Sequence, residues 1–266
     1  MVNYLERIIF EKKRDLERIK PYDQQEILAL MVSAEYRSNH WRQLFKPRNE
    51  PVIIAEIKIS SPSRGSIIEP ESVPFYLSEY HRGGASALSV VTEEKYFKGN
   101  IILLQEVIQN SSLPVLRKDF ILEDTQIYQS AQLGVSALLL IARILSWSRL
   151  RKFIDLCELL NIIPLVEVHD QDDLKKALHA RANYIGINNR NLSTLKVSLD
   201  TTESLLSMVP DEIMVVCESG ISSPEDIQRF MNMGIHHFLI GEYFLFHSQP
   251  GNALQALKGV GRIASG

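Results

Sequence analysis

Cysteine is scarce in this chain of 266 residues, which contains two, Cys157 and Cys217. The two lie far apart without metal-ligand spacing, and the pair His236 and His237 has no third ligand nearby in the sequence. A zinc site needs three or four such ligands. Because a free cysteine is among the most buried residue types, we expect two buried structural thiols and no metal.

Long apolar runs are absent too, and none approaches the ~20 residues that a membrane-spanning helix needs. The net charge of -3 gives no electrostatic case for binding nucleic acid or an anionic membrane. Charges interrupt residues 1–20 too often for a secretory signal, and the acids among them are atypical of a transit peptide. We therefore expect a cytoplasmic protein whose partners include neither a membrane nor nucleic acid.

Glycine-rich phosphate motifs of the GxGxxG or Walker type are also missing, which counts against an open, doubly wound sheet. From Pro51 onward the chain instead alternates short apolar strands with helices, which is typical of parallel βαβ units. Eight such units close a barrel with its helices outside. The predicted strands are 52–58, 87–92, 113–118, 137–141, 164–168, 184–188, 214–218 and 237–241, and the predicted helices are 70–82, 98–110, 123–133, 146–160, 171–180, 199–208, 223–233 and 250–258.

The predicted fold class is therefore α/β, a (β/α)8 TIM barrel with an N-terminal helical extension. Residues 2–46 have helical periodicity, with Pro21 separating two helices, and contain no strand pattern. We expect one domain over 1–266, with the extension at 1–47, the barrel at 51–258 and no second enzyme fused to it. The extension should pack on the barrel, either plugging its bottom or framing its mouth.

Charged and amide residues stand at the carboxyl ends of most predicted strands, where a buried strand should stay apolar. A parallel barrel gathers these ends at one mouth. Burying isolated charges is costly, so such a ring implies mutual pairing around a ligand, as in an enzyme. The charged and amide residues are Glu56, Lys58, Lys118, Glu167, Asn188, Arg190 and Glu218, and Thr92 and Ser219 add hydroxyl groups at the same ends.

Individual members of this ring admit more than one interpretation. Glu56 and Lys58 stand at i and i+2 on one strand face, and form either a structural ion pair or part of a site. Lys118 is placed as a proton donor, and desolvation or neighbouring positive charge would lower its pKa. Arg117 and Asp119 point the other way, and we expect them to cap helices or pair on the outside.

Two regions have the composition of an anion site. The loop SSPSRG at 60–65 offers hydroxyls and backbone amides, although the same composition is merely a turn in most proteins. Ser219 and Gly220, like Gly241 and Glu242, follow the last two predicted strands, where barrel loops often bind phosphate through backbone N–H groups. Because Glu242 would repel an anion, we expect its side chain to turn outward.

Several phrases of the sequence together closely resemble the indole-3-glycerol-phosphate synthase family, the ring-closing decarboxylases of tryptophan biosynthesis. The phrases are AEIK..SPS.G, TEEKYFKG, LRKDFI, LVEVHD, GINNRNL and ESGI..PEDI, in this order. The resemblance covers Pro51 to Phe244 and includes the helical extension. It implies an enzyme that converts carboxyphenylamino-deoxyribulose 5-phosphate to indole-3-glycerol phosphate, carbon dioxide and water without a cofactor.

The resemblance also implies roles for single residues. Lys118 is similar to the general acid that protonates the ketone oxygen, and Glu167 to its partner acid/base, which helps to remove water. Glu56 and Asn188 resemble groups that orient the substrate, and Lys58 a lysine that steadies its charge. The residues implied around the anthranilate ring are Phe97, Phe120, Leu139 and Leu239, although Phe120 could instead be a residue of the core. Those implied at the mouth are Arg190, Leu192 and Glu218. Those implied along the phosphate-binding stretch are Ser61, Ser219, Gly220, Gly241 and Glu242.

Two alternative functions stay open at this point. A barrel like phosphoribosylanthranilate isomerase would pair a strand-one cysteine with an aspartate, whereas the first predicted strand here offers Glu56 and Lys58 and no cysteine. A non-catalytic phosphate-binding barrel would have an eroded mouth, yet the charged residues are present. In each case the expected partner is a phosphorylated small molecule, and we expect a monomer or a weak homo-oligomer.

Overall fold

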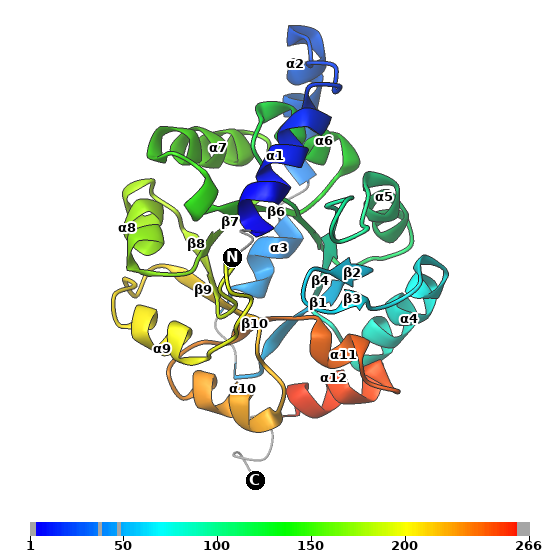
Figure 1. Ribbon diagram of the computed structural model, residues 1–266, viewed down its shortest axis with the longest axis vertical. Coiled ribbons are helices and arrows are strands. Elements are labelled where there is room, and N and C mark those ends of the chain that lie inside the picture. Colours follow the sequence, from blue (N-terminus) through cyan, green and yellow to red (C-terminus); the bar gives the residue numbers. More distant parts are fainter. Residues whose placement is uncertain (1–3, 37–38, 47–48, 260–266) are drawn as a thin grey trace.

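The computed structural model describes residues 4–36, 39–46 and 49–259. Eight parallel strands form a closed barrel, in which the first strand pairs with both the second and the last (Figure 1). The predicted (β/α)8 fold is confirmed, and every predicted strand end lies within two residues of the observed one. The barrel strands are β1 (Val52–Ile57), β4 (Ala87–Val91), β5 (Val115–Lys118), β6 (Ala137–Ile141), β7 (Ile163–Val168), β8 (Tyr184–Asn188), β9 (Met214–Glu218) and β10 (His237–Ile240).

Helices surround the barrel, and their ends follow the local sequence. The Ser223 hydroxyl accepts the backbone N–H of Asp226 at 3.1 Å and so caps the helix that Pro224 begins. Gly134 ends another helix in the left-handed conformation, with φ of 81°. The outer elements are α4 (Val73–Gly83), α5 (Ile101–Gln109), α6 (Asp124–Leu133), α7 (Trp147–Leu159), α8 (Gln171–His179), α9 (Asp200–Leu206), α10 (Pro224–Met231) and α12 (Pro250–Lys258), with 3-10 turns η2 (Pro70–Ser72) and η3 (Ala142–Ile144).

Two short structures lie among the loops at the carboxyl ends of the strands. The loop after β1 contains an antiparallel hairpin of β2 (Ser60–Ser61) and β3 (Gly65–Ser66). A single helical turn, α11 (Glu242–Leu245), follows β10 directly. Both lie where the sequence predicts loops that contact an anion.

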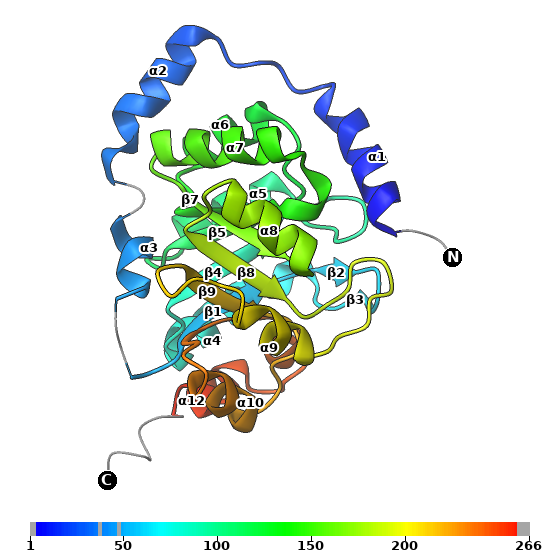
Figure 2. The same cartoon turned by 90° about the vertical axis from the view of Figure 1, so that its left-hand side faces the viewer.

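The N-terminal segment contacts both ends of the barrel, so both predicted placements occur (Figure 2). The prediction of two helices was incomplete, because α1 (Tyr4–Leu16) and α2 (Gln24–Val32) are followed by the turn η1 (Ser33–Tyr36) and the helix α3 (Asn39–Leu44). Just after α3, the ring of Phe45 stacks on His237 at 4.3 Å, at the first residue of β10. At the opposite end, Lys12 of α1 pairs with Asp119. Parts of the predicted extension at 1–47 lie outside the described residues.

The interior of the barrel and its outer layer form two separate apolar clusters. In β1, Ile53, Ala55 and Ile57 face the helices, whereas Val52 and Ile54 face the interior. The same alternation turns the side chain of Glu56 inward. The interior is filled by Val52, Ile54, Ala87, Leu116, Ala137, Leu139, Ile163, Leu165, Val216 and Leu239, with Trp41, Leu44 and Phe45 around the bottom. The barrel is therefore a packed core that supports polar groups at its upper rim.

Cys157 and Cys217 are both buried free thiols, as expected from the sequence. Within the described part of the chain, no helix has the length and apolar character that crossing a membrane requires.

Candidate active site

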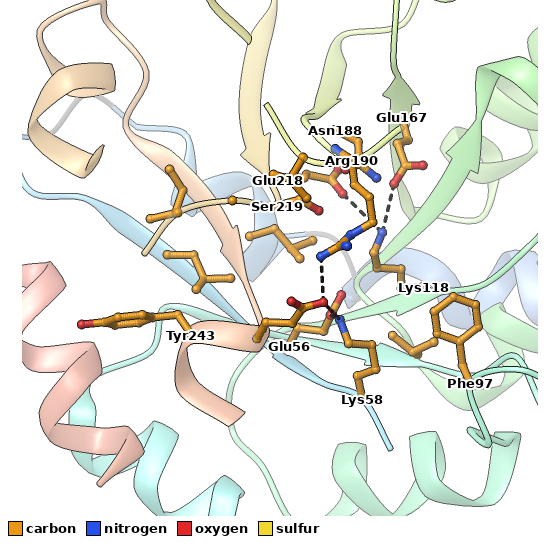
Figure 3. A pocket seen from close by; sticks show the side chains of 18 of the residues that line it. Glu56, Lys58, Phe97, Lys118, Glu167, Asn188, Arg190, Glu218, Ser219 and Tyr243 are labelled. Atoms are coloured by element: carbon orange, nitrogen blue, oxygen red, sulfur yellow. Dashed lines mark hydrogen bonds and ion pairs between the residues drawn. The ribbon is translucent and has the colours of Figure 1, made fainter. Parts of the chain in front are cut away.

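A pocket of about 650 Å³ opens at the carboxyl ends of the barrel strands (Figure 3). Its volume is typical of sites for small molecules. Ser61 is not among the described residues that line it, but all other predicted site residues are. These are Glu56, Lys58, Phe97, Lys118, Phe120, Leu139, Glu167, Asn188, Arg190, Leu192, Glu218, Ser219, Gly220, Leu239, Gly241 and Glu242.

Lys118 lies between two carboxylates that come from other strands of the barrel. Its ammonium donates to Oε2 of Glu167 at 3.0 Å and to Oε2 of Glu218 at 3.3 Å. Lys118 ends β5, Glu167 lies near the end of β7 and Glu218 ends β9. Closure of the barrel therefore brings the three side chains together. Both carboxylates are almost fully buried, whereas the lysine side chain is 19% exposed toward the pocket.

Burial and neighbouring charge set the protonation of this trio. Burial favours a neutral lysine, but the carboxylates of Glu167 and Glu218 outweigh it and raise the pKa of Lys118 far above its ordinary value. The expectation of a lowered pKa was therefore wrong. Burial works against a charged Glu167 as well, yet Lys118 and His169 hold its pKa low. Burial and the charge of Glu167 together raise the pKa of Glu218.

A second group of charges surrounds the side chain of Glu242. Arg190 donates to its Oε1 at 2.7 Å, Lys58 Nζ lies 3.8 Å from the same oxygen, and Arg64 Nε lies 3.6 Å from Oε2. Lys58 also pairs with Glu56 at 2.9 Å. The expectation that Glu242 turns outward was wrong, because three cations from the β1 and β8 loops attract its carboxylate into the pocket.

Two glycines leave the space that the inner carboxylates occupy. A Cβ on Gly186 in β8 would lie 2.0 Å from Oε1 of Glu218, and one on Gly241 would lie 2.6 Å from Oε1 of Glu56. Both distances are far below van der Waals contact. Burial opposes ionisation of Glu56, but Lys58 and Lys118 together hold its pKa below the ordinary value. Because a side chain at Gly186 or Gly241 would collide with these carboxylates, glycine at both positions is part of the site.

A tight turn follows β9 at the edge of the pocket. Ser219 and Gly220 both have positive φ, 64° and 91°, a conformation that is rare for a residue with a side chain. The side chain of Asn189 donates to the carbonyls of Glu218 and Ser219 at 3.1 and 3.0 Å. Next to it in sequence, the amide oxygen of Asn188 accepts the N–H of Arg190 at 2.9 Å, which leaves the amide nitrogen to donate to a ligand. The turn is thus held in a fixed shape.

The remaining wall of the pocket is apolar. The rings of Phe97 and Phe120 lie 6.3 Å apart at 43° to each other. Leu139 and Leu239 project from β6 and β10, and Leu192 from the loop after β8. Such a wall fits a flat aromatic group at one end of a ligand whose other end is charged.

Arg117 and Asp119 were expected to pair on the outside, and they do pair, at 2.9 Å. However, both are buried. Arg117 reaches under α6, where it donates to Ser130 Oγ at 3.0 Å. Asp119 lines the pocket and binds Lys12 of α1 at 2.7 Å. Burial opposes ionisation of Asp119, but Lys12 and Arg117 lower its pKa. Asp119 therefore connects the N-terminal helix to the site.

Arg64 and His169 are among the polar residues near the site that were not predicted, and one predicted residue lies outside the pocket. Arg64 lines the pocket from the β2–β3 hairpin. His169 lies 3.2 Å from Glu167, and its position at i+2 from that residue was the available signal. Ser61 belongs to the same hairpin as Arg64, but it is buried and its hydroxyl lies 3.3 Å from that of Ser63.

Comparison with known proteins gives a consistent result. The family model for indole-3-glycerol phosphate synthase matches residues 5–257. A curated protein of that name from Polaromonas naphthalenivorans is 44% identical over 79% of this chain and 80% of its own length. Another from Caldanaerobacter subterraneus is 40% identical over 91% and 93%, and one from Campylobacter jejuni is 37% identical over 94% and 98%.

Solved structures with much lower identity share the barrel. KGPDC from Streptococcus mutans aligns with a TM-score of 0.63 at 11% identity, over 82% of this chain and 100% of that one. The 3-hexulose-6-phosphate synthase from Salmonella typhimurium aligns with a TM-score of 0.62 at 8% identity, over 80% and 99%. These likenesses concern the fold alone. The family model and the curated relatives go further, and they show that the chain belongs to the indole-3-glycerol phosphate synthase family.

Proposed function

We propose that this pocket converts 1-(2-carboxyphenylamino)-1-deoxyribulose 5-phosphate to indole-3-glycerol phosphate, carbon dioxide and water. The observation that carries the proposal is the position of Lys118. Its ammonium is held by two buried carboxylates and lies between Phe97 on the apolar wall and Arg190 on the charged wall (Figure 3). The substrate has a matching order of groups: an aromatic ring, a ketone and a phosphate.

Ring closure needs an acid at the ketone oxygen, and Lys118 is placed to supply it. The arylamine nitrogen pushes electrons to the ring carbon that bears the carboxylate, and this carbon attacks the ketone. The ketone oxygen takes a proton from Lys118 and becomes a hydroxyl group. The carboxylate then leaves as carbon dioxide, and its bonding electrons restore the aromatic ring. The raised pKa of Lys118 means that the side chain carries a proton before the reaction starts.

Loss of water completes the indole, and Glu167 is the proposed base. The hydroxyl group takes a second proton from Lys118, which solvent has reprotonated after ring closure, and leaves as water. Glu167 removes a proton from the adjacent carbon, so that the ring double bond forms. The low pKa of Glu167 supports a carboxylate that is ionised and able to accept a proton. Two protons are donated and one is taken, and the net uptake of one proton balances the loss of the carboxylate as neutral carbon dioxide.

Binding of the two ends of the substrate supplies the remaining rate enhancement. Acid–base catalysis alone contributes about 10²–10⁴-fold, so positioning must provide the rest. We assign the phosphate to the cations Arg190 and Lys58, next to the turn at Ser219 and Gly220 and to Gly241. Glu242 occupies this cation group in the structure and must move aside when phosphate binds. The anthranilate ring lies against Phe97, Phe120, Leu139, Leu192 and Leu239, and Glu56 and Asn188 orient the substrate.

The alternatives explain fewer of these features. An isomerase of the phosphoribosylanthranilate type would use a cysteine base on the first strand, and β1 (Val52–Ile57) has none. Both cysteines of the chain are buried in other elements. A non-catalytic barrel has no need for Lys118 between two buried carboxylates. Burying these charges costs stability, and clusters of this kind are found mainly at functional sites.

A direct assay distinguishes these functions. The purified protein is incubated separately with the carboxyphenylamino substrate and with phosphoribosylanthranilate, and indole absorbance is followed. We expect indole to form from the first substrate only. Turnover of the second would favour the isomerase, and binding of the first without product would favour the non-catalytic barrel.

We further propose that the reaction needs no cofactor, since the arylamine of the substrate drives it, and that the protein acts in the cytoplasm. We expect a monomer or a weak homo-oligomer, which analytical ultracentrifugation would test.

A further inference from the structure

His169 lies directly behind Glu167, away from the pocket. Its Nε2 is 3.2 Å from Oε1 of Glu167, and its Nδ1 is 3.4 Å from Oδ2 of Asp173 in the first turn of α8. The side chains of His169 and Glu167 are each 2% exposed, and His169 is not among the described residues that line the pocket. A ligand would therefore contact Glu167 and not the imidazole.

The two oxygens of Glu167 thus face different partners. Oε2 accepts from Lys118 on the pocket side, and Oε1 faces the imidazole. Neither imidazole nitrogen meets the full geometric criteria of a hydrogen bond, so the two contacts are close ion-pair contacts. Burial opposes a charged imidazole, but Asp173 and Glu167 outweigh it and raise the pKa of His169 to about 9.

Asp173 is itself held in place. Its Oδ2 accepts the backbone N–H of His169 at 3.2 Å and Nε of Arg143 at 3.1 Å. Arg143 belongs to η3, so three elements meet around the imidazole. The charged groups packed near the imidazole are Glu167 from β7, Asp173 from α8 and Arg143 from η3, followed by Lys118 from β5, Glu218 from β9 and Asp170, which pairs with Arg143.

We propose that His169, anchored by Asp173, is a positioning residue that fixes the orientation of Glu167 and determines which of the two carboxylates beside Lys118 is negatively charged. The inference rests on the proposed role of Glu167 as the base. A cation behind Glu167 keeps the negative charge there and leaves the proton on Glu218. Without it, Lys118 alone would face two similar carboxylates, and the preference for an ionised Glu167 would weaken.

If His169 lowers the pKa of Glu167, then Glu167 must raise the pKa of His169 by the same interaction energy. The interaction can therefore be tested without substrate. Histidine side-chain NMR titrations are compared for the wild type, Glu167→Gln and Asp173→Asn. We expect His169 to titrate near pH 9 in the wild type and its midpoint to fall by about one unit or more in each variant. His179 at the end of α8, which contacts the Trp147 ring of α7, supplies a second histidine signal in the same spectra. A wild-type midpoint near 6.5, or a midpoint unaffected by either substitution, would overturn the proposal.

The pH profile of turnover distinguishes positioning from packing. In His169→Gln, the acidic limb of the kcat profile should move up by about one unit, because Glu167 becomes easier to protonate, while KM changes less than about twofold. His179→Gln is the matched control and should keep the wild-type profile. A lower kcat in His169→Gln with an unmoved limb would indicate packing alone and refute the inference. If the wild type shows no turnover, the proposed function fails, and the NMR midpoints still decide whether His169 controls the charge of Glu167.

Discussion

At the scale of single residues, the site depends on a charge balance around Lys118. One ammonium faces two carboxylates, and the pKa values of these carboxylates are moved in opposite directions, down for Glu167 and up for Glu218. Pairs of acids with separated pKa values are the usual means by which one site holds both a proton donor and a proton acceptor. Gly186 contributes to this balance, since any larger residue would displace the Glu218 carboxylate.

The first prediction concerns Lys118→Ala. Loss of the acid should lower kcat by at least about 10²–10⁴-fold, the usual contribution of a general acid. The fold should survive, because the raised pKa of Glu218 keeps that residue protonated and His169 still faces the ionised Glu167. Steady-state kinetics and circular dichroism measure the two effects. Lys175→Ala, on the exposed face of α8, is the control, and wild-type turnover in Lys118→Ala would exclude the acid role.

The second prediction concerns Glu242→Gln. Its carboxylate occupies the cation group that we assign to phosphate, so removing the charge should free Arg190 and lower KM by about threefold to tenfold. The effect should shrink at high salt, which screens charges at a partly open site. Substrate titrations at two ionic strengths measure both trends. Glu212→Gln, at an exposed turn, is the matched control. A raised KM would mean that Glu242 helps to hold the substrate.

The direction of Glu242 shows what residue-level reasoning from sequence misses. The side chain was expected to turn outward because a bound anion would repel it, and this argument considered only the ligand next to Glu242. The observed inward turn follows from Arg190, 52 positions earlier in the chain, and from Lys58 and Arg64 on the first loop. The pKa of Lys118 was misjudged for the same reason, since it depends on Glu167 and Glu218, which only barrel closure brings near.

At the scale of elements, the N-terminal helix is part of the architecture of the mouth. Lys12 of α1 is 12% exposed and binds the fully buried Asp119, one residue beyond β5 and next to Lys118 in sequence. Arg117 and Thr92 donate to the same carboxylate at 2.9 and 2.8 Å. The position of α1 and the end of β5 are therefore linked through one buried anion.

The third prediction concerns Lys12→Met. Leaving a buried charge without any partner costs about 3–5 kcal/mol. Arg117 still pairs with Asp119, so we expect a loss of about 2 kcal/mol, which for a chain of this size lowers Tm by roughly 4–8 °C. Turnover should fall several-fold, because the segment that carries Lys118 loses its anchor. Thermal melts and kcat are compared with Lys13→Met, an exposed neighbour in the same helix. Equal behaviour of the two variants would contradict the anchoring role.

A helix or strand could be predicted from the sequence when the residues that determine it lie within it or beside it in the chain. The barrel strands were predicted because fully buried parallel strands are continuous apolar runs between capped helices. The helix α3 and the β2–β3 hairpin were not separated from their surroundings, because they are short. The place of α3 is instead fixed by distant contacts, such as Phe45 with His237 and Tyr184 at the bottom of the barrel.

At the scale of the whole molecule, the structure combines a dry interior with a rim of buried charges. Below the rim, the barrel is filled with aliphatic side chains and closed by Trp41, which is fully buried. Above it, Glu56, Glu167, Asp119 and Asp173 have lowered pKa values despite burial, whereas His169 has a raised one. Folding stability must therefore depend on pH, with opposite signs for these two classes of group.

The final prediction is the shape of that dependence. The acids with lowered pKa values stabilise the fold above their unfolded values near 4, and this contribution is lost as the pH falls. His169 stabilises it fully below 6.5, and its contribution is lost as the pH rises through about 9. Glu218 behaves like His169, because its pKa is raised to about 8, so its contribution is present below about 4.5 and is lost as the pH rises. Stability should thus be greatest near pH 5 and decline toward pH 9, with His169 accounting for up to about 3 kcal/mol of the decline above pH 6.5. Urea melts across this range measure it. His169→Gln should flatten the alkaline decline, and an unchanged decline would assign it to other groups, such as Glu218.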